Sequence, residues 1–289
     1  MAKDVFADLH SHTLASDGEW TPRQLVDAAA DAGLQALAVT DHDTVDSVAQ
    51  AIDVGKARGI EIIPGCELTV YEQNTELHML ALFIDPDAPA FSDLLRNMQH
   101  HRRERALAMG ARLRAAGFAI DDADIIEAAG SAVSLGRPHV AAALVKRGHA
   151  RTIYGAMLHF LVEGKPGFIA KYKLSAEDAF RAVHASGGVA LLAHPGIAPH
   201  DELIAPLFRR GMDGVEAVYP SHSEVNERFY KGLAGRYEKL ICGGSDFHGP
   251  IVRPDRVLGM SGVSRSTLEA LRRKADYYRT RNAALSGHI

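Results

Sequence analysis

The sequence predicts an α/β fold in which a mainly parallel, barrel-like sheet carries a helical insertion. The chain has 289 residues, and about seven short apolar runs alternate with amphipathic helical patterns. Strands that alternate with helices of about 10–15 residues are typical of parallel βαβ units. Between residues 92 and 164 only helical patterns occur. We therefore expect a first barrel part over 1–98, a helical insertion over 99–165 and a second barrel part over 166–289.

The predicted elements are bounded by recognisable start and stop signals. Thr21 and Pro22 suit the N-cap and first position of a helix that Gly33 ends, and Ser175 with Asp178 resembles a capping box. The predicted strands cover 6–9, 36–40, 60–64, 78–83, 188–193, 214–218 and 239–242. The further helices are expected over 44–59, 93–116, 122–129, 138–146 and 154–162. The last four helical patterns form the insertion between the fourth and fifth strands.

The composition is that of an ordinary soluble globular protein. Apolar residues make up 47%, charged residues 24%, and the net charge is −4, which excludes global disorder and gives no sign of a non-specific nucleic-acid binder. No apolar run approaches the ~20 residues of a membrane span, and the first residues lack a signal-peptide pattern. Cys66 and Cys242 are too few for a disulfide scaffold and are expected as buried thiols. We expect a cytoplasmic protein with no obligate protein partner.

Most of the informative histidines lie at the ends of the predicted strands. The chain has 15 histidines. The first strand leads into His10 and His12, and because side chains alternate along a strand, both rings point to one side. Other potential ligands follow or flank the strands: Asp17, His42, Glu67, His78, His194, Asp246 and His248, and His222 follows the sixth strand at the same barrel end. Since the carboxyl ends of barrel strands meet on one face, we expect these side chains to converge.

This mixture of imidazoles and carboxylates indicates a metal centre with more than one ion. Each motif alone is weak, because a histidine pair on a strand is more often a polar patch and Asp-His-Asp also suits a helix start. Their occurrence together, in order, is much more specific. Six histidines and three carboxylates exceed the roughly four ligands of one tetrahedral site, so two or three divalent metals are expected.

These residues resemble the motifs of the PHP (polymerase and histidinol phosphatase) family of the amidohydrolase superfamily. The matching motifs are His10-x-His12, Asp17, Thr40-Asp41-His42, Glu67, His78, Ala193-His194-Pro195 and Gly244-Ser245-Asp246-x-His248. The resemblance covers nearly the whole chain and implies a distorted (β/α)7 barrel with a trinuclear metal centre. It implies one metal on His10, His12, Glu67 and Asp246, a second on the shared Glu67 with His78 and His194, and a third on Asp17, His42 and His248.

Within the family, the helical insertion and the segment 134–139 resemble a subgroup of nucleotide and RNA phosphoesterases. The resemblance implies a metal-dependent phosphatase that removes the 3′-phosphate of nucleoside 3′,5′-bisphosphates, with Mn as metal and Fe or Zn also possible ions. A second interpretation is a 5′→3′ exoribonuclease acting on short RNA. A third is a histidinol-phosphatase-like phosphomonoesterase, and a fourth is a non-catalytic PHP module.

Candidate substrate-binding residues lie outside the ligand set. Arg137 is suited to a bidentate phosphate contact at a helix N-terminus, with Ser134 and His139 beside it, although all three would also serve as helix-start residues. Lys171 is a candidate for a phosphate contact at the cavity mouth, and its alternative interpretation is a solvated surface lysine. His222 is a candidate for binding phosphate or for protonating the leaving group, and its alternative interpretation is a hydrogen-bonded structural histidine.

Two further observations complete the expected site. Asp246 is expected to orient or deprotonate the nucleophile, and Arg137 to neutralise phosphoryl charge. The basic run 100–105 within the long helix is usually a solvated helix face, and its functional interpretation is attraction of RNA.

Overall fold

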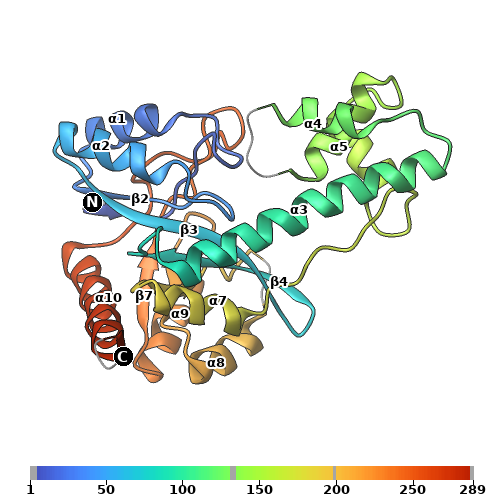
Figure 1. The fold of residues 1–289 in the computed structure, drawn as a ribbon. Helices are drawn as coiled ribbons and strands as arrows, with labels where there is room; N and C mark the ends of the chain where they lie inside the picture. Colours follow the sequence, from blue (N-terminus) through green and yellow to red (C-terminus); the bar gives the residue numbers. More distant parts are fainter. Residues whose placement is uncertain (1–4, 131–134, 198–199, 287–289) are drawn as a thin grey trace. The chain divides into compact units, whose positions relative to one another are not determined.

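The fold was obtained as a computed structural model that describes residues 5–130, 135–197 and 200–286 (Figure 1). The chain divides into two compact units. The first consists of Met1–Leu94 with Leu174–Ile289, and the second is Leu95–Lys173. The predicted insertion of 99–165 lies within the second unit. Among the described residues, no helix is both long and apolar enough to span a membrane.

The first unit is built on a seven-stranded sheet whose strands lie side by side in chain order. The strands are β1 (Ala7–Asp8), β2 (Ala36–Val39), β3 (Glu61–Glu72), β4 (Thr75–Leu82), β5 (Val189–Leu192), β6 (Gly214–Val218) and β7 (Leu240–Gly243). Pairing is parallel except that β4 is antiparallel to both β3 and β5. Consecutive strands joined by helices thus become neighbours, as expected of a βα-barrel.

The two edges of this sheet approach each other without forming a continuous ladder. The Leu9 amide donates to the Gly243 carbonyl over 3.2 Å, and Ser11 forms an isolated parallel bridge with Phe247. The sheet is therefore a distorted, incompletely closed barrel, and the predicted fold class is confirmed.

The β3–β4 hairpin differs from the expected series of parallel units. Gln73 and Asn74 form its turn with φ values of 49° and 68°, which is the left-handed geometry that matches the strand twist in tight hairpins. The strand β3 extends to Glu72, eight residues beyond the predicted end. The residues 65–72 were not predicted as strand because Gly65, Glu67, Thr69 and Glu72 interrupt the apolar pattern.

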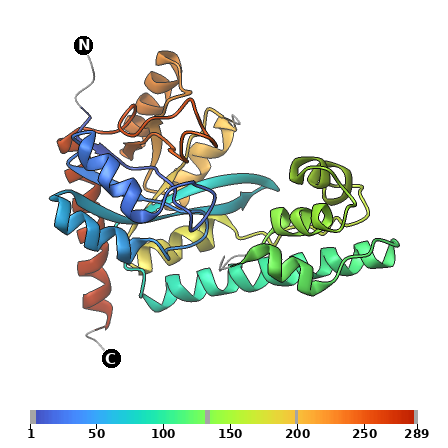
Figure 2. The same ribbon diagram turned by 90° about the horizontal axis from the view of Figure 1, so that it is seen from above.

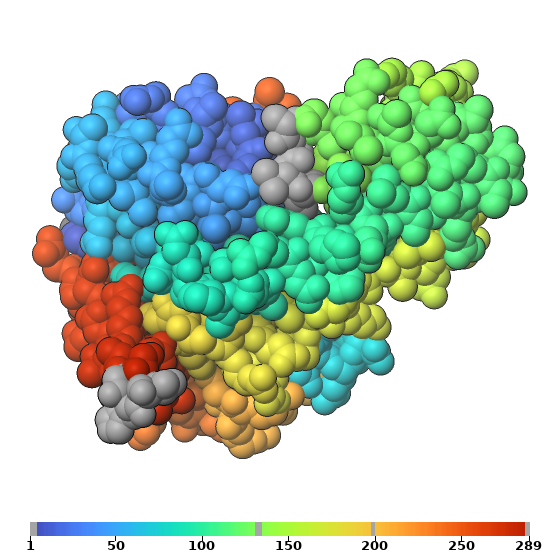
Figure 3. All heavy atoms as spheres, viewed as in Figure 1, coloured from blue at the N-terminus to red at the C-terminus, as the bar shows by residue number. Residues whose placement is uncertain are grey.

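Helices cover the sheet and bury two apolar layers. The helices of this unit are α1 (Pro22–Asp31), α2 (Val48–Arg58), α7 (Ala176–Ala185), α8 (Asp201–Arg210), α9 (Glu224–Arg236) and α10 (Arg265–Ser286). Leu9, Leu80 and Leu191 belong to a buried cluster that includes residues of α10, and Leu25 with Leu37 belongs to a second cluster under α1 and α2. In Figure 3 the blue atoms of α1 and α2 form one continuous outer surface.

The second unit is helical and has its own core. It contains most of α3 (Pro89–Ala115), then α4 (Asp122–Ala129), α5 (Arg137–Lys146), α6 (Ile153–Ala156) and the π-helical turn Met157–Leu161, as Figure 2 shows along the teal and green part of the chain. Met109 and Leu113 of α3 pack with Ile125 and Leu144 in one fully buried cluster. The helical character predicted for this region is thus found. Cys66 and Cys242 are free, buried thiols, as expected.

Candidate metal centre

All nine predicted metal ligands lie in the first unit, at one end of the sheet. The parallel strands present their carboxyl ends there, so the segments after β1, β2, β5 and β7 arrive from the same direction. β4 runs the opposite way, and the amino-terminal half of this strand therefore lies at the same end. The amide of Ala193 donates to the His78 carbonyl over 2.9 Å, which sets His78 beside His194.

Glu67 occupies the centre of the cluster and is only 1% exposed. Its Oε2 lies 3.1 Å from His10 Nε2, 3.2 Å from His12 Nε2 and 3.3 Å from His42 Nδ1. Three imidazoles from two strand ends thus face one carboxylate oxygen.

The other oxygen of Glu67 faces a different pair of histidines. Oε1 lies 2.9 Å from His78 Nδ1 and 2.9 Å from His194 Nε2. Burial opposes ionisation of Glu67, but the surrounding histidines, first His42 and then His10, hold its pKa well below the usual range. A carboxylate with both oxygens engaged by different histidine groups has the geometry required to bridge two cations.

Asp246 approaches the same histidines from the segment after β7. Its Oδ1 lies 3.4 Å from both His10 Nε2 and His12 Nε2, and its Oδ2 accepts a hydrogen bond of 2.7 Å from the Tyr219 hydroxyl. Asp246 has a φ of 53°, in the left-handed region that few non-glycine residues adopt. Such local strain is common where a side chain must be aimed at a functional site.

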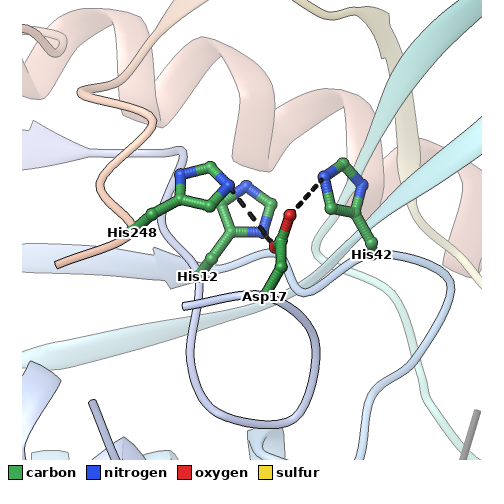
Figure 4. Close-up of side chains that lie close together, drawn as sticks. All are labelled: His12, Asp17, His42 and His248. Carbon is green, nitrogen blue, oxygen red and sulfur yellow. Dashed lines mark ion pairs between the residues drawn. The ribbon is translucent and has the colours of Figure 1, made fainter. Parts of the chain in front are cut away.

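A third, more open group surrounds Asp17 (Figure 4). His248 Nε2 lies 3.4 Å from an Asp17 oxygen, and His42 Nε2 and His12 Nδ1 each lie 3.7 Å from one. The other ring nitrogen of His248 donates to the Asp246 carbonyl over 2.9 Å, which leaves Nε2 directed at Asp17. The Asp17 side chain is 55% exposed, so this group lies at the solvent side of the cluster.

The donor atoms present fit divalent cations. His12 is fully buried, yet neither of its ring nitrogens makes a hydrogen bond, although Glu67 and Asp246 oxygens lie 3.2 and 3.4 Å away. Buried polar atoms without hydrogen bonds are costly unless another partner, such as a metal ion, satisfies them. Side chains whose donor atoms all lie within 4.8 Å of one another form three groups: His10, His12, Glu67 and Asp246; His42, Glu67 and His78; and His12, Asp17, His42 and His248.

These groups can be compared with the three ligand sets that the family resemblance implies. The first group has the same members as the first implied set. In the second, His42 stands with Glu67 and His78, while His194 reaches Glu67 at 2.9 Å. In the third, His12 joins the expected residues.

Two carboxylates support the candidate ligands in ways that the sequence did not predict: Asp41, expected only as a motif residue, and Glu216, which was not expected at the site. Asp41 accepts hydrogen bonds of 2.7 Å from the Thr13 amide, the Thr13 hydroxyl and the Ser16 hydroxyl, and so holds the loop between His12 and Asp17. Glu216, fully buried in β6, contacts His10. A single charged residue within the apolar run 214–218 was the available signal for it, because a buried carboxylate requires partners.

His222 lies at the same end of the barrel but is engaged by the backbone. Its Nδ1 lies 3.0 Å from the Ala217 carbonyl, and its Nε2 accepts a hydrogen bond of 3.1 Å from the Gly196 amide. A Cβ at Gly196 would lie 2.7 Å from the imidazole ring, so only glycine fits here. The ring thus supports the turn that follows His194, and its predicted role in proton transfer stays a prediction.

The remaining candidate substrate-binding residues lie in the second unit. Arg137 is the first residue of α5, and His139 Nδ1 accepts a hydrogen bond of 2.9 Å from the Gly136 amide, which caps that helix. Burial lowers the pKa of His139. Lys171 is exposed, and Ser134 lies outside the described residues. Their contact with substrate stays a prediction.

A cavity of about 220 Å³ adjoins the cluster on the side of β4 and β5. Two ligand candidates, His78 and His194, form part of its wall, and Leu77, Pro195 and Ile197 supply apolar surface. The site therefore combines a polar, carboxylate-rich centre with a neighbouring apolar recess.

Comparison with known proteins agrees with this arrangement. The PHP domain model matches residues 8–134. A phosphoribosyl 1,2-cyclic phosphate 1,2-diphosphodiesterase of Eggerthella lenta is 32% identical over 88% of this chain and 98% of the relative. A 3′,5′-nucleoside bisphosphate phosphatase of Chromobacterium violaceum is 34% identical over 84% of this chain and 87% of the relative. A 5′-3′ exoribonuclease of Escherichia coli is 34% identical over 85% of this chain and 86% of the relative.

Solved structures are similar over nearly the same length. A Bifidobacterium adolescentis protein, described as a candidate metal-dependent phosphoesterase, superposes on this chain with a TM-score of 0.79 at 29% identity. The superposition covers 95% of this chain and 98% of the other. An amidohydrolase of Chromobacterium violaceum with bound sulfate has a TM-score of 0.75 at 31% identity, covering 93% and 96%. The resemblance seen in the motifs is thereby confirmed: the chain belongs to the PHP domain family.

Proposed function

We propose that this PHP-domain phosphoesterase hydrolyses the 3′-phosphate of nucleoside 3′,5′-bisphosphates to a nucleoside 5′-monophosphate and phosphate. The observation that carries the proposal is the convergence of five histidine rings on the two oxygens of Glu67, with Asp246 and Asp17 beside them. The 34% identity to a bisphosphate phosphatase of C. violaceum supports this substrate class.

The chemistry divides between the metals and the side chains. Divalent cations, when bound, supply a nucleophilic water at neutral pH and neutralise charge on a phosphoryl group. Asp246 is suited to orient or deprotonate the attacking water, because Tyr219 holds its Oδ2 while its Oδ1 faces His10 and His12. We assign phosphate binding to Arg137, Ser134, His139 and Lys171 on the strength of the family resemblance.

We further propose the number and type of the cations. Two or three ions fit the nine candidate ligands, which are six imidazoles and three carboxylates. Mixed nitrogen and oxygen donors suit Mn, Fe or Zn, and Mn is favoured by the family resemblance. We also propose that the enzyme works in the cytoplasm, where nucleotide and RNA substrates occur.

The cavity beside His78 and His194 is proposed to receive the nucleoside part of the substrate. Leu77, Pro195 and Ile197 provide the apolar surface that suits a base or ribose, whereas the ligand side chains line the polar side.

A direct test compares substrates on one metal-loaded preparation. Protein reconstituted with Mn, Fe or Zn would be incubated with adenosine 3′,5′-bisphosphate, a 5′-phosphorylated dinucleotide, a ribose 1,2-cyclic phosphate and histidinol phosphate. Phosphate release and nucleotide products would be followed by chromatography and ³¹P NMR. The bisphosphate should be turned over fastest and yield the 5′-monophosphate. Efficient hydrolysis of another ester without release of the 3′-phosphate would refute the proposal.

A second candidate function, 5′→3′ exoribonuclease activity, is favoured by the distribution of charge. The unit Leu95–Lys173 has 13 basic and 6 acidic residues, a net charge of +7, while the other unit has 19 basic and 30 acidic residues, a net charge of −11. The overall value of −4 therefore conceals a strongly basic helical unit. Basic surfaces attract nucleic acid through release of counterions.

An aromatic pair lies within the same basic unit. Tyr172 stacks on His101 with ring centroids 4.1 Å apart, and it lies between Lys171 and Lys173 in the sequence. Exposed rings beside cations are the usual platform for single-stranded nucleic acid. The ratio of dinucleotide to bisphosphate turnover, measured at 50 and 300 mM salt, separates the two functions. An exoribonuclease should prefer the dinucleotide and lose that preference as salt rises.

A further inference from the structure

Glu216 is the one charged residue of β6, a strand that is buried throughout. Its side chain is fully buried, and a carboxylate in such surroundings is costly unless charged or hydrogen-bonding partners surround it. It is neither among the nine candidate metal ligands nor able to contact solvent. Its partners therefore indicate what it does.

The first partner is the ring of His10. Glu216 Oε1 and Oε2 lie 3.1 and 3.3 Å from His10 Nδ1. The other ring nitrogen, Nε2, faces Glu67 Oε2 at 3.1 Å and Asp246 Oδ1 at 3.4 Å. A carboxylate on Nδ1 keeps the proton on that atom and leaves the lone pair of Nε2 directed at the metal position.

The second partner is the backbone of His194. The His194 amide donates to Glu216 Oε2 over 2.8 Å. His194 has a φ of 26°, an unusual conformation for a non-glycine residue, and its ring reaches Glu67 Oε1, whereas His10 faces Oε2. One carboxylate thus orients two ligand candidates that serve different metal positions.

We propose that Glu216 is a positioning residue that fixes His10 in the Nδ1-protonated form and holds His194 in its strained conformation, and that it thereby sets the metal affinity of both positions. This inference rests on the proposed function in one respect only: it requires that the cluster binds metal ions, and it does not depend on which substrate is hydrolysed. Removing outer partners of metal ligands typically lowers metal affinity by about 10–100-fold.

The decisive variant is Glu216→Gln. Two N–H groups face the two carboxylate oxygens, and an amide offers only one oxygen, so one donor would face the side-chain NH₂ group. We expect a metal affinity lower by about 10–100-fold, measured by metal content after dialysis against graded chelator. Excess metal should restore most of the kcat, since the ligands themselves are intact.

Asp213→Asn is the matched control. Asp213 precedes the same strand, is also buried and also pairs with a histidine, His184, at 2.7 Å, and its partners in the described part of the chain include none of the candidate ligands. This variant should keep the wild-type metal affinity even if its stability falls. If Glu216→Gln retains wild-type metal content and affinity, the proposal is wrong.

A measurement on the unaltered protein keeps the test independent of variant folding. In Zn-loaded protein, long-range ¹H–¹⁵N NMR should report His10 with its proton on Nδ1, protected from exchange. A proton on Nε2 would overturn the proposal. Both readouts are independent of turnover, so lost metal affinity in a protein that hydrolyses no bisphosphate would refute the proposed substrate while leaving this inference intact.

Discussion

The different burial of Glu67 and Asp17 predicts that the metal positions differ in affinity. Glu67 is 1% exposed and lies within 3.3 Å of five histidine nitrogens, whereas Asp17 is 55% exposed with contacts of 3.4 to 3.7 Å. We compare Glu67→Gln with Asp17→Asn, because both changes remove one negative charge and conserve the side-chain shape.

The expected magnitudes follow from burial. Removing one partner of a buried charge cluster costs about 3–5 kcal/mol, which corresponds to a loss of about 10² to 4 × 10³ in affinity at 1.4 kcal/mol per factor of ten. An exposed ion pair is screened by solvent and typically contributes about 0–1 kcal/mol, which corresponds to a change in metal affinity of less than about tenfold. Glu67→Gln should therefore lose two ions during dialysis, and Asp17→Asn should lose one ion only under stronger chelation.

The assay is metal content by mass spectrometry after dialysis against graded chelator, with thermal unfolding of the metal-free proteins as a check on folding. Glu72→Gln is the matched control, because Glu72 lies on the same strand but pairs with Arg210 at 2.7 Å. A release of metal from Asp17→Asn equal to or greater than that from Glu67→Gln would contradict the expected difference between the two positions.

Three further predictions concern other parts of the molecule. Burial opposes ionisation of Asp213, but His184, the Ala190 amide and the Tyr278 hydroxyl hold its pKa below the usual range. Its contribution to stability is thus complete above about pH 4 and is lost as the pH falls through the lowered pKa, so denaturant unfolding should be more acid-sensitive in the wild type than in Asp213→Asn. His222→Ala leaves the Ala217 carbonyl and the Gly196 amide without their side-chain partner, so it should lower the free energy of unfolding by about 1–3 kcal/mol and kcat by less than about tenfold. A loss of kcat above about 100-fold with unchanged stability would indicate that His222 transfers a proton instead. Arg137→Ala should raise KM for a bisphosphate at least about tenfold while metal content stays unchanged, and an unaltered KM would remove Arg137 from the substrate site.

The strand ends and the metal candidates were predictable because they depend on local patterns. The apolar run before His10 and His12, and those before Asp41 and His194, place polar residues where strands stop. The parallel pairing of successive strands then brings these ends together. The caps at Thr21 and Ser175 are likewise local, and both accept the predicted hydrogen bonds.

The antiparallel hairpin of β3 and β4 was not predictable in the same way. Its turn at Gln73 and Asn74 lacks glycine, and the strand beyond Glu67 is only partly buried, so the apolar pattern weakens. Yet this hairpin decides that His78 faces Glu67 from the same end of the sheet. Pairing direction depends on contacts between distant segments, which no local pattern records.

The histidine count indicated a metal centre, and the motif order indicated the family, because ligand chemistry is a property of residue type and spacing. The central place of Glu67, the open position of Asp17 and the support of His10 by Glu216 depend on distances between residues far apart in the chain, such as His10 and Glu216, which are 206 positions apart. Such distances exist only once the sheet has formed and burial has made each unpaired carboxylate costly. For this chain, local sequence specifies which candidate ligands are present, and packing specifies which of their atoms converge at positions where a metal ion would fit.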